Sequence, residues 1–187
     1  MSEKTLEALK SQFGESVIST SVFRGDATAV VKREKIIEVL GFLKEKENYE
    51  QLMDLTVVDY LKYPGGWEGR ERFALVYNLY SYEGHRRFRV KVPLPEDNPS
   101  VETACVFWRS ADWLEREAWD MFGVVFTGHP NLKRLLMYEE FEGHPLRKDY
   151  HYLKQQPLVE LLPSDEPLPD EMDDEVQHPR KLKRETE

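Results

Sequence analysis

Acidic and imidazole side chains gather in one stretch of this sequence, where they are its most obvious candidates for chemistry. Carboxylates and histidines are ligands for zinc and iron, and each can act as a general acid or base. The stretch contains Glu115, Glu117, Asp120, His129 and His144. Metal ligands on a helix need a spacing such as Glu-x-x-His, which puts both on one face, and these residues lack it. The spacing favours ion pairs and hydrogen bonds; a free-standing metalloenzyme built on Glu117, Asp120, His129 and His144 is the alternative.

Each of the two histidines stands between a glycine and a proline. The segments Gly128-His129-Pro130 and Gly143-His144-Pro145 have the composition of turns. Glycine permits unusual φ angles there, and proline fixes the φ angle of the next residue. We expect both histidines to be turn residues that donate hydrogen bonds to the backbone, rather than metal ligands or catalytic bases.

Other catalytic and cofactor signatures are missing from the sequence. Cys105 is the only cysteine, so the chain cannot form an internal disulfide or supply the four cysteines of a conventional iron–sulfur cluster. Its apolar neighbours predict a buried thiol that acts as a small hydrophobe. The glycines near Gly65 do not match a nucleotide-binding loop, and no Gly-x-Ser-x-Gly elbow occurs. The sequence thus predicts no catalytic residue, no bound cofactor and no metal ligand in this chain.

A helix must position the acidic residues, and its limits follow from the sequence. Asp112 is a good N-cap, Glu115 three residues later completes an Asp-x-x-Glu capping box, and Gly123 is a natural stop. Asp120 lies in the last turn, where the helix dipole disfavours an acid. Arg116, four residues earlier, offers it only a weak ion pair. We therefore infer a tertiary partner for Asp120 among the basic residues that follow, which are Lys133, Arg134, Arg147 and Lys148.

The rest of the chain alternates amphipathic helices with strand-like segments. Helices are expected at residues 3–13, 34–46, 101–108 and 113–122. Strands are expected at residues 16–23, 27–31, 52–63, 71–81 and 85–92. Hairpins without regular βαβ alternation indicate an α+β fold. Counted with the short helix at 101–108 that leads into it, the helix at 113–122 ends the element order α-β-β-α-β-β-β-α. This order predicts a largely antiparallel sheet with helices on one face.

Composition divides the chain into three parts. Residues 1–123 carry the regular elements and form the predicted α+β domain. Residues 124–152 form a Gly-His-Pro docking segment, which is too long and irregular for an ordinary connection. Its aromatic and arginine content suits an interface, so we expect docking on another protein to fix its shape. Packing within this chain is the alternative explanation of those aromatic residues.

Residues 153–187 form an acidic, proline-rich tail. Such a composition cannot bury enough apolar surface to fold alone. Apolar residues near its start, including Leu158 and Leu161, favour an extended arm laid over a partner. A free, solvated tail is the alternative.

The overall composition restricts the partners. The chain has 187 residues, 40% of them hydrophobic, and a formal net charge of -9. This charge argues against nucleic acid or an anionic lipid surface as the main partner. No apolar run approaches the roughly 18 residues needed to span a bilayer, and the N-terminus lacks the apolar core of a signal peptide. A cytosolic compartment is the default expectation for a chain with one cysteine.

Motifs across residues 113–150 resemble a known family. The run LEREAWDMFG at residues 114–123 is followed by GHP at 128–130, RLLM at 134–137 and EGHPLRKDY at 142–150. These motifs closely resemble the C subunit of bacterial NADH-quinone oxidoreductase, respiratory complex I. The element order of residues 5–110 is similar to that family's α+β domain. Two positions depart from the family, which often has tyrosine in place of Trp119 and proline in place of His151.

The resemblance implies a structural role in a larger assembly. The family's C subunit has no cofactor and packs against the D (quinone-site) subunit, near the B subunit and the iron–sulfur subunits, on the cytoplasmic side of the inner membrane. The whole complex carries FMN and iron–sulfur clusters, and it couples electron transfer from NADH to quinone with proton translocation. The equivalent subunit of a related membrane-bound hydrogenase is the alternative. The matching residues expected at the partner interface are Glu115, Arg116, Glu117, Asp120, Gly123, His129, Pro130, Arg134, His144, Pro145, Arg147, Lys148, Asp149 and Tyr150.

Overall fold

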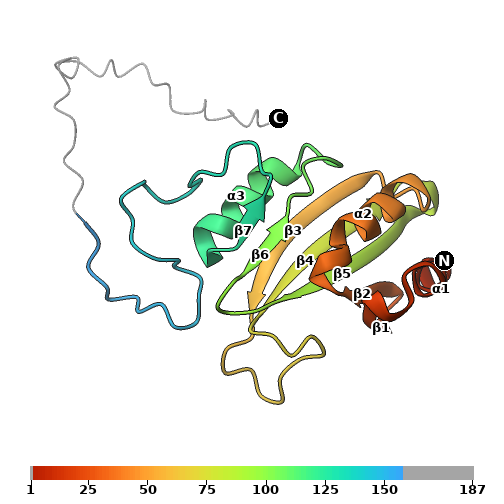
Figure 1. Ribbon diagram of the computed structural model, residues 1–187, viewed down its shortest axis with the longest axis horizontal. Coiled ribbons are helices and arrows are strands. Elements are labelled where there is room, and N and C mark those ends of the chain that lie inside the picture. The colour runs from red at the N-terminus through yellow and green to blue at the C-terminus, as the bar shows by residue number, and fades with distance from the viewer. Residues whose placement is uncertain (1, 158–187) are drawn as a thin grey trace, which may run out of the picture. The chain divides into compact units, whose positions relative to one another are not determined.

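The computed structural model describes residues 2–157. The first part of the chain forms a five-stranded sheet (Figure 1). Its strands are β1 (Val17–Phe23), β2 (Asp26–Val31), β3 (Gln51–Asp59), β4 (Phe73–Ser81) and β5 (Arg86–Leu94), in the order β1-β2-β5-β4-β3. Neighbouring strands are antiparallel except β2 and β5, which are parallel. The predicted α+β class is confirmed, and the sheet predicted as largely antiparallel is mixed at this one seam.

The parallel seam arises where two antiparallel units meet. The β1–β2 hairpin turns through Arg24 (φ 52°) and Gly25 (φ 87°), the pair of positive φ angles that suits a two-residue hairpin. Helix α2 (Ile36–Glu45) then carries the chain from β2 to the far edge strand, β3. The β3–β4–β5 meander leads back from there, so β5 arrives beside β2 running in the same direction.

The helices share one hydrophobic core with one face of the sheet. Leu75 and Tyr77 of β4 belong to the same core as Leu9 of α1 (Ser2–Phe13), Leu40 of α2 and Phe122 of α3 (Ala111–Phe122). Successive strand residues point to opposite faces, so a core that takes alternate strand residues lies on one face. This agrees with the helix placement expected from the sequence. Short 3-10 helices occupy Gly14–Ser16, Arg33–Lys35 and Glu83–His85.

A small second sheet stands where one helix was expected. Residues 101–108 are not helical; strand β6 (Ser100–Glu102) begins this stretch, and a turn follows it. β6 pairs in parallel with β7 (Val125–Thr127), which comes just after α3. The prediction of a helix here is wrong because the backbone of β6 finds its hydrogen-bonding partner beyond the next helix. A local apolar pattern cannot show such a partner.

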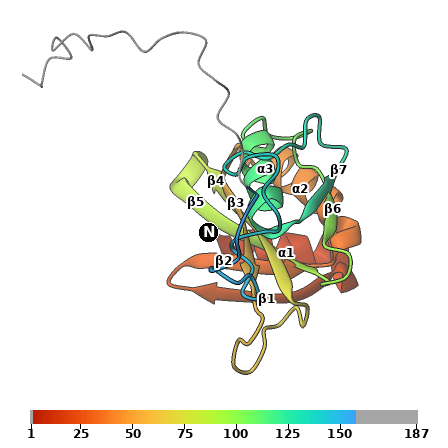
Figure 2. The same ribbon diagram turned by 90° about the vertical axis from the view of Figure 1, so that its left-hand side faces the viewer.

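After β7 the described chain continues in turns that run along α3 (Figure 2). Residues 2–157 belong to one compact unit, and the predicted division into residues 1–123 and 124–152 stays a prediction. The acidic, proline-rich tail predicted for residues 153–187 lies, from residue 158 onward, outside the described residues. Within residues 2–157, the helices are all too short or too polar to cross a membrane.

Candidate partner-docking site

The carboxylate of Asp120 holds the segment that follows α3. Asp120 is fully buried, and its Oδ2 accepts backbone hydrogen bonds from Leu135 (3.0 Å), Leu136 (2.8 Å) and Met137 (2.9 Å). Its Oδ1 accepts a charge-assisted bond from Nη1 of Arg134 at 2.6 Å. The tertiary partner inferred for Asp120 is therefore confirmed, and it is Arg134. One side chain in the last turn of α3 fixes four consecutive residues of the segment.

Arg116 bonds to the same segment rather than to its helical neighbour Asp120. Its Nε and Nη2 donate to the carbonyl oxygens of Lys133 (3.2 Å) and Arg134 (3.3 Å). Arg134 in turn donates through Nη2 to the carbonyl oxygen of Phe141 at 2.6 Å. The weak helical pair expected between Arg116 and Asp120 is replaced because each side chain finds a better partner across the segment.

His144 and Arg147 close the C-terminal end of α3. Nδ1 of His144 donates to the carbonyl oxygen of Asp120 at 3.0 Å, and Nε of Arg147 donates to the carbonyl oxygen of Phe122. These donors satisfy helix carbonyls that have no partner within the helix. Gly123 follows with φ +77°, and a Cβ atom there would lie 2.5 Å from His144 Nε2 and 2.6 Å from Arg147 Nη2. Both its backbone angle and the lack of space require glycine at this position.

Replacement of Gly123 by alanine tests this junction. We expect Gly123→Ala to lower the free energy of unfolding by about 2–3 kcal/mol, since it adds positive-φ strain and displaces two capping side chains. Gly14→Ala is the matched control, because Gly14 also has positive φ (+47°) but open space around it. Urea unfolding of both variants measures the difference. Equal losses in the two variants would show that the contact with His144 and Arg147 contributes nothing.

A second buried carboxylate, Glu115, anchors the turn before α3. Its Oε2 accepts a hydrogen bond from Oγ1 of Thr103 and its Oε1 accepts the backbone N–H of Ala104, both at 2.6 Å. The N-cap of α3 is Ser110, so the predicted capping box of Asp112 and Glu115 is wrong. Glu115 points inward instead, because the buried turn has donors that need an acceptor.

Three ligand-type side chains of the described residues come close together near Glu115. Single ligand atoms of Cys105, Glu115 and His129 lie within 4.8 Å of one another. Nδ1 of His129 accepts the backbone N–H of Asn131 at 3.0 Å, and its Nε2 donates to the carbonyl oxygen of Asp112 at 3.1 Å. Both ring nitrogens are therefore occupied, and a metal ion would have to replace one of these bonds. The prediction that His129 donates to the backbone from a turn is confirmed.

The alternative ligand set of the metalloenzyme hypothesis is not assembled in the described residues. Glu117 is exposed on α3, Asp120 is bound to Arg134, and His144 donates to a helix carbonyl. The turn role predicted for His144 is thus confirmed as well. Cys105 is half-buried rather than fully buried, and burial raises the pKa of its thiol, which disfavours the nucleophilic thiolate.

A cluster that the sequence did not reveal fastens the far end of the segment. Arg72 donates from Nε (3.2 Å) and Nη2 (2.9 Å) to the carboxylate of Asp59, at the end of β3. It also donates from Nη1 (3.1 Å) and Nη2 (2.6 Å) to Asp149, and its Nη1 reaches Glu96. Asp59 accepts the backbone N–H of Lys148 at 2.9 Å as well. Since Arg72 and Asp149 are 77 positions apart, no local spacing could signal this contact.

The last predicted residues have smaller roles in the geometry. The ring of Tyr150 stacks on Phe141 with centroids 6.1 Å apart, and its hydroxyl accepts a hydrogen bond from Gln156. Pro130 is exposed and Pro145 is half-buried, as expected for residues that shape turns.

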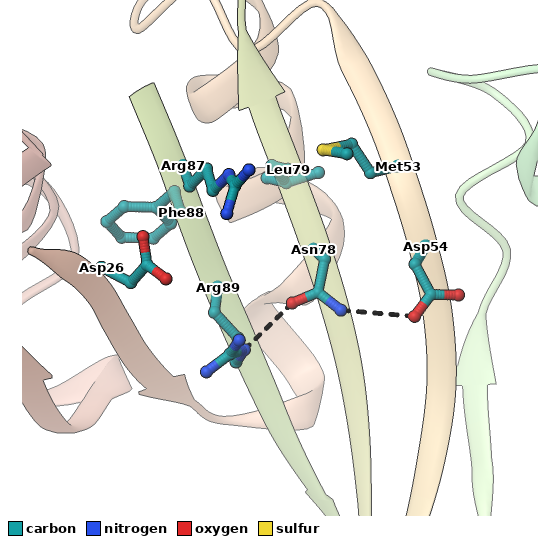
Figure 3. Close-up of a pocket in the computed structure, with 8 residues that line it drawn as sticks. All are labelled: Asp26, Met53, Asp54, Asn78, Leu79, Arg87, Phe88 and Arg89. Atoms are coloured by element: carbon teal, nitrogen blue, oxygen red, sulfur yellow. Dashed lines mark hydrogen bonds between the residues drawn. The ribbon is translucent and has the colours of Figure 1, made fainter. Parts of the chain in front are cut away.

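A separate hollow of about 320 Å³ lies on the sheet face away from the core (Figure 3). Nε of Arg89 donates to Oδ1 of Asn78 at 3.0 Å, and Nδ2 of Asn78 donates to Oδ2 of Asp54 at 3.4 Å. This chain of bonds links three neighbouring strands, and Asp26 and Met53 also line the hollow. None of the residues singled out from the sequence lies there.

Comparison with known proteins identifies the family. Residues 29–156 match the family described as the 30 kDa subunit of respiratory-chain NADH dehydrogenase. The NADH-quinone oxidoreductase C subunit of Geobacter metallireducens is 46% identical over 142 residues, which cover 76% of this chain and 85% of that protein. The C subunit of Roseiflexus castenholzii is 44% identical over 147 residues, covering 77% and 80%. This chain belongs to the family of NADH-quinone oxidoreductase C subunits.

Solved structures share the architecture of this C subunit. A trypsin-resistant fragment of Nqo5 has a TM-score of 0.62 and 36% identity, and the match covers 70% of this chain and 98% of the fragment. A chain of the membrane-bound sulfane sulfur reductase, an archaeal respiratory membrane complex, has a TM-score of 0.67 and 25% identity, covering 81% and 86%. As a C subunit, this chain is part of complex I, and other subunits of the complex are its partners.

Acid is expected to loosen the segment after α3 before it unfolds the sheet. Burial by itself raises the pKa of Asp120 and of Asp59, but the hydrogen bonds that these carboxylates accept lower it by more. The hydrogen bonds from Arg72 lower the pKa of Asp149. All three pKa values therefore lie below the ordinary 3.8. Such groups stabilise the fold above the unfolded pKa, and this contribution is lost as the pH falls through the folded pKa. Glu115 acts in the opposite sense, because burial raises its pKa above 4.5.

Thermal unfolding from about pH 7 down to pH 2.5 measures this effect. The melting temperature of the wild type should fall more steeply with acid than that of Asp120→Asn, which has lost one of the three carboxylates. Parallel curves for the two proteins would contradict the assignment of the acid sensitivity to Asp120.

Proposed function

We propose that this chain is a cofactor-free structural subunit of its complex. It docks on the D (quinone-site) subunit, near the B subunit and the iron–sulfur subunits, on the cytoplasmic side of the inner membrane. The complex, with its FMN and iron–sulfur clusters, passes electrons from NADH to quinone and translocates protons. This chain keeps those subunits in place and performs none of the electron transfer or proton transfer.

One observation supports this proposal: in α3 and residues 124–157, the buried polar side chains bond within the chain, whereas large apolar side chains are exposed. The polar groups of the buried Asp120 and Glu115 and of the half-buried His144 are bonded within this chain, so none of the three is poised to act on a substrate. Large apolar side chains in the same region remain exposed, among them Trp113 (60%) and Tyr152 (85%). Exposed apolar groups gathered in one region are typical of contact surfaces.

This division assigns two roles to the residues that match the family. Asp120, Gly123 and Arg134 act as positioning residues, which hold the segment in shape without facing a partner. The contact itself is made by exposed side chains around them, including Leu136 and Leu146. For these three residues the interface role is therefore indirect.

A matched pair of variants tests the docking surface in the assembled complex. Leu146 and Met53 are each 51% exposed, but Met53 lies on the far sheet face. We expect Leu146→Glu to reduce the fraction of this chain that co-purifies with its complex from mildly solubilised membranes, whereas Met53→Glu should leave it unchanged. Mass spectrometry of the captured complex identifies the partner subunits. Full recovery of Leu146→Glu with the complex would remove the support for docking through this surface.

The likeness to a chain of the sulfane sulfur reductase complex favours a second candidate function, as the equivalent subunit of a related membrane-bound complex. The higher identity to the C subunits of NADH-quinone oxidoreductase, 46% against 25%, favours the first candidate. Co-purification with NADH-oxidising subunits, or without them, separates the two.

A further inference from the structure

Strand β1 leaves one edge of the five-stranded sheet without a pairing partner among residues 2–157. Its seven residues, VISTSVF, contain no charge and no proline. Ile18 (42%), Val22 (44%) and Phe23 (71%) are exposed large apolar side chains on this one strand. An edge strand presents a row of free backbone N–H and C=O groups, and free-standing proteins normally protect it with charges or proline. The residues of β1 themselves supply neither form of protection; one charge from the loop after β3 reaches the strand, because the Glu68 carboxylate accepts a hydrogen bond from Oγ of Ser19 at 3.4 Å.

The opposite edge of the same sheet is protected. Oγ of Ser110 donates to the carbonyl oxygen of Leu52 at 3.3 Å, and Nε1 of Trp108 donates to the carbonyl oxygen of Glu50 at 2.9 Å. Strand β3 also carries a charge, Asp54, whereas both edge strands have a register shift in their pairing, at Ile18 in β1 and at Met53 in β3. In the described part of the chain, no side chain makes a comparable bond to the backbone of β1. Side-chain hydrogen bonds therefore cover part of the backbone at the β3 edge, whereas the backbone of the β1 edge has no such cover within the described residues.

We infer that β1 is a strand-addition site, which an extended segment of a neighbouring protein fills in the assembled complex. Main-chain hydrogen bonds to the free edge of β1 would supply the affinity. The occupant should be an uncharged, β-branched strand, because a charged side chain opposite β1 would find no charge on β1 to pair with. Val22 faces the side of the core, since it pairs with the buried Ala27. An apolar residue opposite Val22 would extend that core.

The sequence of this chain argues against its own tail as the occupant. Within residues 158–187, no run free of both charge and proline is longer than three residues. A strand that matched the seven residues of β1 would need a longer run. Family membership instead provides neighbouring subunits. This inference rests on that membership and goes beyond the docking surface proposed for α3 and residues 124–157.

Hydrogen exchange of the full-length chain, alone and in the purified complex, tests the inference directly. Alternate N–H groups of an antiparallel strand point away from its partner, so about half of the amides in residues 17–23 are unpaired in the isolated chain. We expect these amides to exchange about tenfold more slowly, or slower still, in the complex. Peptides from residues 133–150 report on the other surface in the same experiment, so failure of one proposal can be told from failure of the other.

Three results would overturn the inference. The first is an unchanged exchange rate of residues 17–23 in the complex. The second is protection of the isolated chain that grows with its concentration, because β1 would then pair with a second copy. The third is protection in the isolated chain that disappears when residues 158–187 are removed, because the tail would then be the occupant.

A charge on the edge gives an independent test. Ser21 is exposed in the middle of β1, and Ser11 is exposed on α1. We expect Ser21→Lys to lower the recovery of this chain with the complex about fivefold or more, because a lysine blunts an edge strand. Ser11→Lys should have no effect. Urea unfolding of the isolated variants shows whether both still fold, and normal recovery of a folded Ser21→Lys variant would refute the site.

Discussion

Replacement of Asp120 by asparagine is expected to release the segment after α3 and to lower its local stability by about 3–5 kcal/mol, the usual cost of breaking a buried ion pair. The carboxylate accepts four hydrogen bonds, three from consecutive backbone N–H groups and one from Arg134. An asparagine has one acceptor oxygen and would turn its NH₂ group toward donors. Several buried donors would lose their acceptor, and the segment would open to solvent.

Limited trypsin digestion of the isolated chain measures this release, because Lys133 and Arg134 are cleavage sites within the clamped region. We expect Asp120→Asn to be cut there at least about a hundredfold faster than the wild type, given the free-energy loss. Glu117→Gln is the control, since Glu117 is exposed on the same helix and should change stability by less than about 0.5 kcal/mol. A cleavage rate in Asp120→Asn equal to that of Glu117→Gln would contradict the clamp.

Replacement of Arg72 by glutamine is expected to have the second largest effect. The side chain of Asp59 is fully buried, and Arg72 is its bidentate partner. Loss of the guanidinium leaves a buried carboxylate uncompensated, at a cost of about 3–5 kcal/mol in the free energy of unfolding. The same substitution frees Asp149, so the end of the segment would lose its contact with Arg72 and keep the bond from the backbone N–H of Lys148 to Asp59.

A double-mutant cycle between Arg72→Gln and Asp59→Asn isolates this contact. We expect a coupling energy of about 2–3 kcal/mol, near the upper end for residues in one hydrogen-bonded network. Arg72→Lys should recover only part of the loss, because an ammonium group cannot serve both oxygens in the planar geometry of a guanidinium. Arg109→Gln controls for the loss of a positive charge at an exposed position. Additive effects in the cycle would show that Arg72 and Asp59 do not stabilise one another.

Features set by nearby residues could be predicted from the sequence. The helix that ends at Gly123 and the β1–β2 hairpin turn follow from apolar spacing and from glycine chemistry. The tertiary partner of Asp120 could be inferred because an acid in the last turn of a helix is unfavourable without one. The position of Asp120 in the helix was therefore the feature of the sequence that indicated a partner.

Features that depend on distant residues could not be predicted. β6 is a strand only because β7 pairs with it. The apolar spacing around Val101, taken alone, fits a helix equally well. Glu115 has the spacing of a capping box with Asp112, but burial near Thr103 decides its partner. Arg72 looks like an ordinary loop arginine until the fold brings Asp59 and Asp149 to it. The weak sign in the sequence was an acidic residue at the end of β3 and an arginine directly before β4.

The three antiparallel pairs of the sheet, β1–β2, β3–β4 and β4–β5, join strands that follow one another in the chain, whereas the parallel seam joins Ala27 to Phe88 and Val30 to Lys91. Closing so long a loop costs entropy before any contact repays it. We therefore expect this step to limit the rate of folding. During synthesis, β2 would be paired with β1 alone until β5 has left the ribosome. Substitutions at the seam should slow refolding, while those at Asp120 and Arg72 should mainly speed unfolding, a contrast that chevron kinetics would reveal.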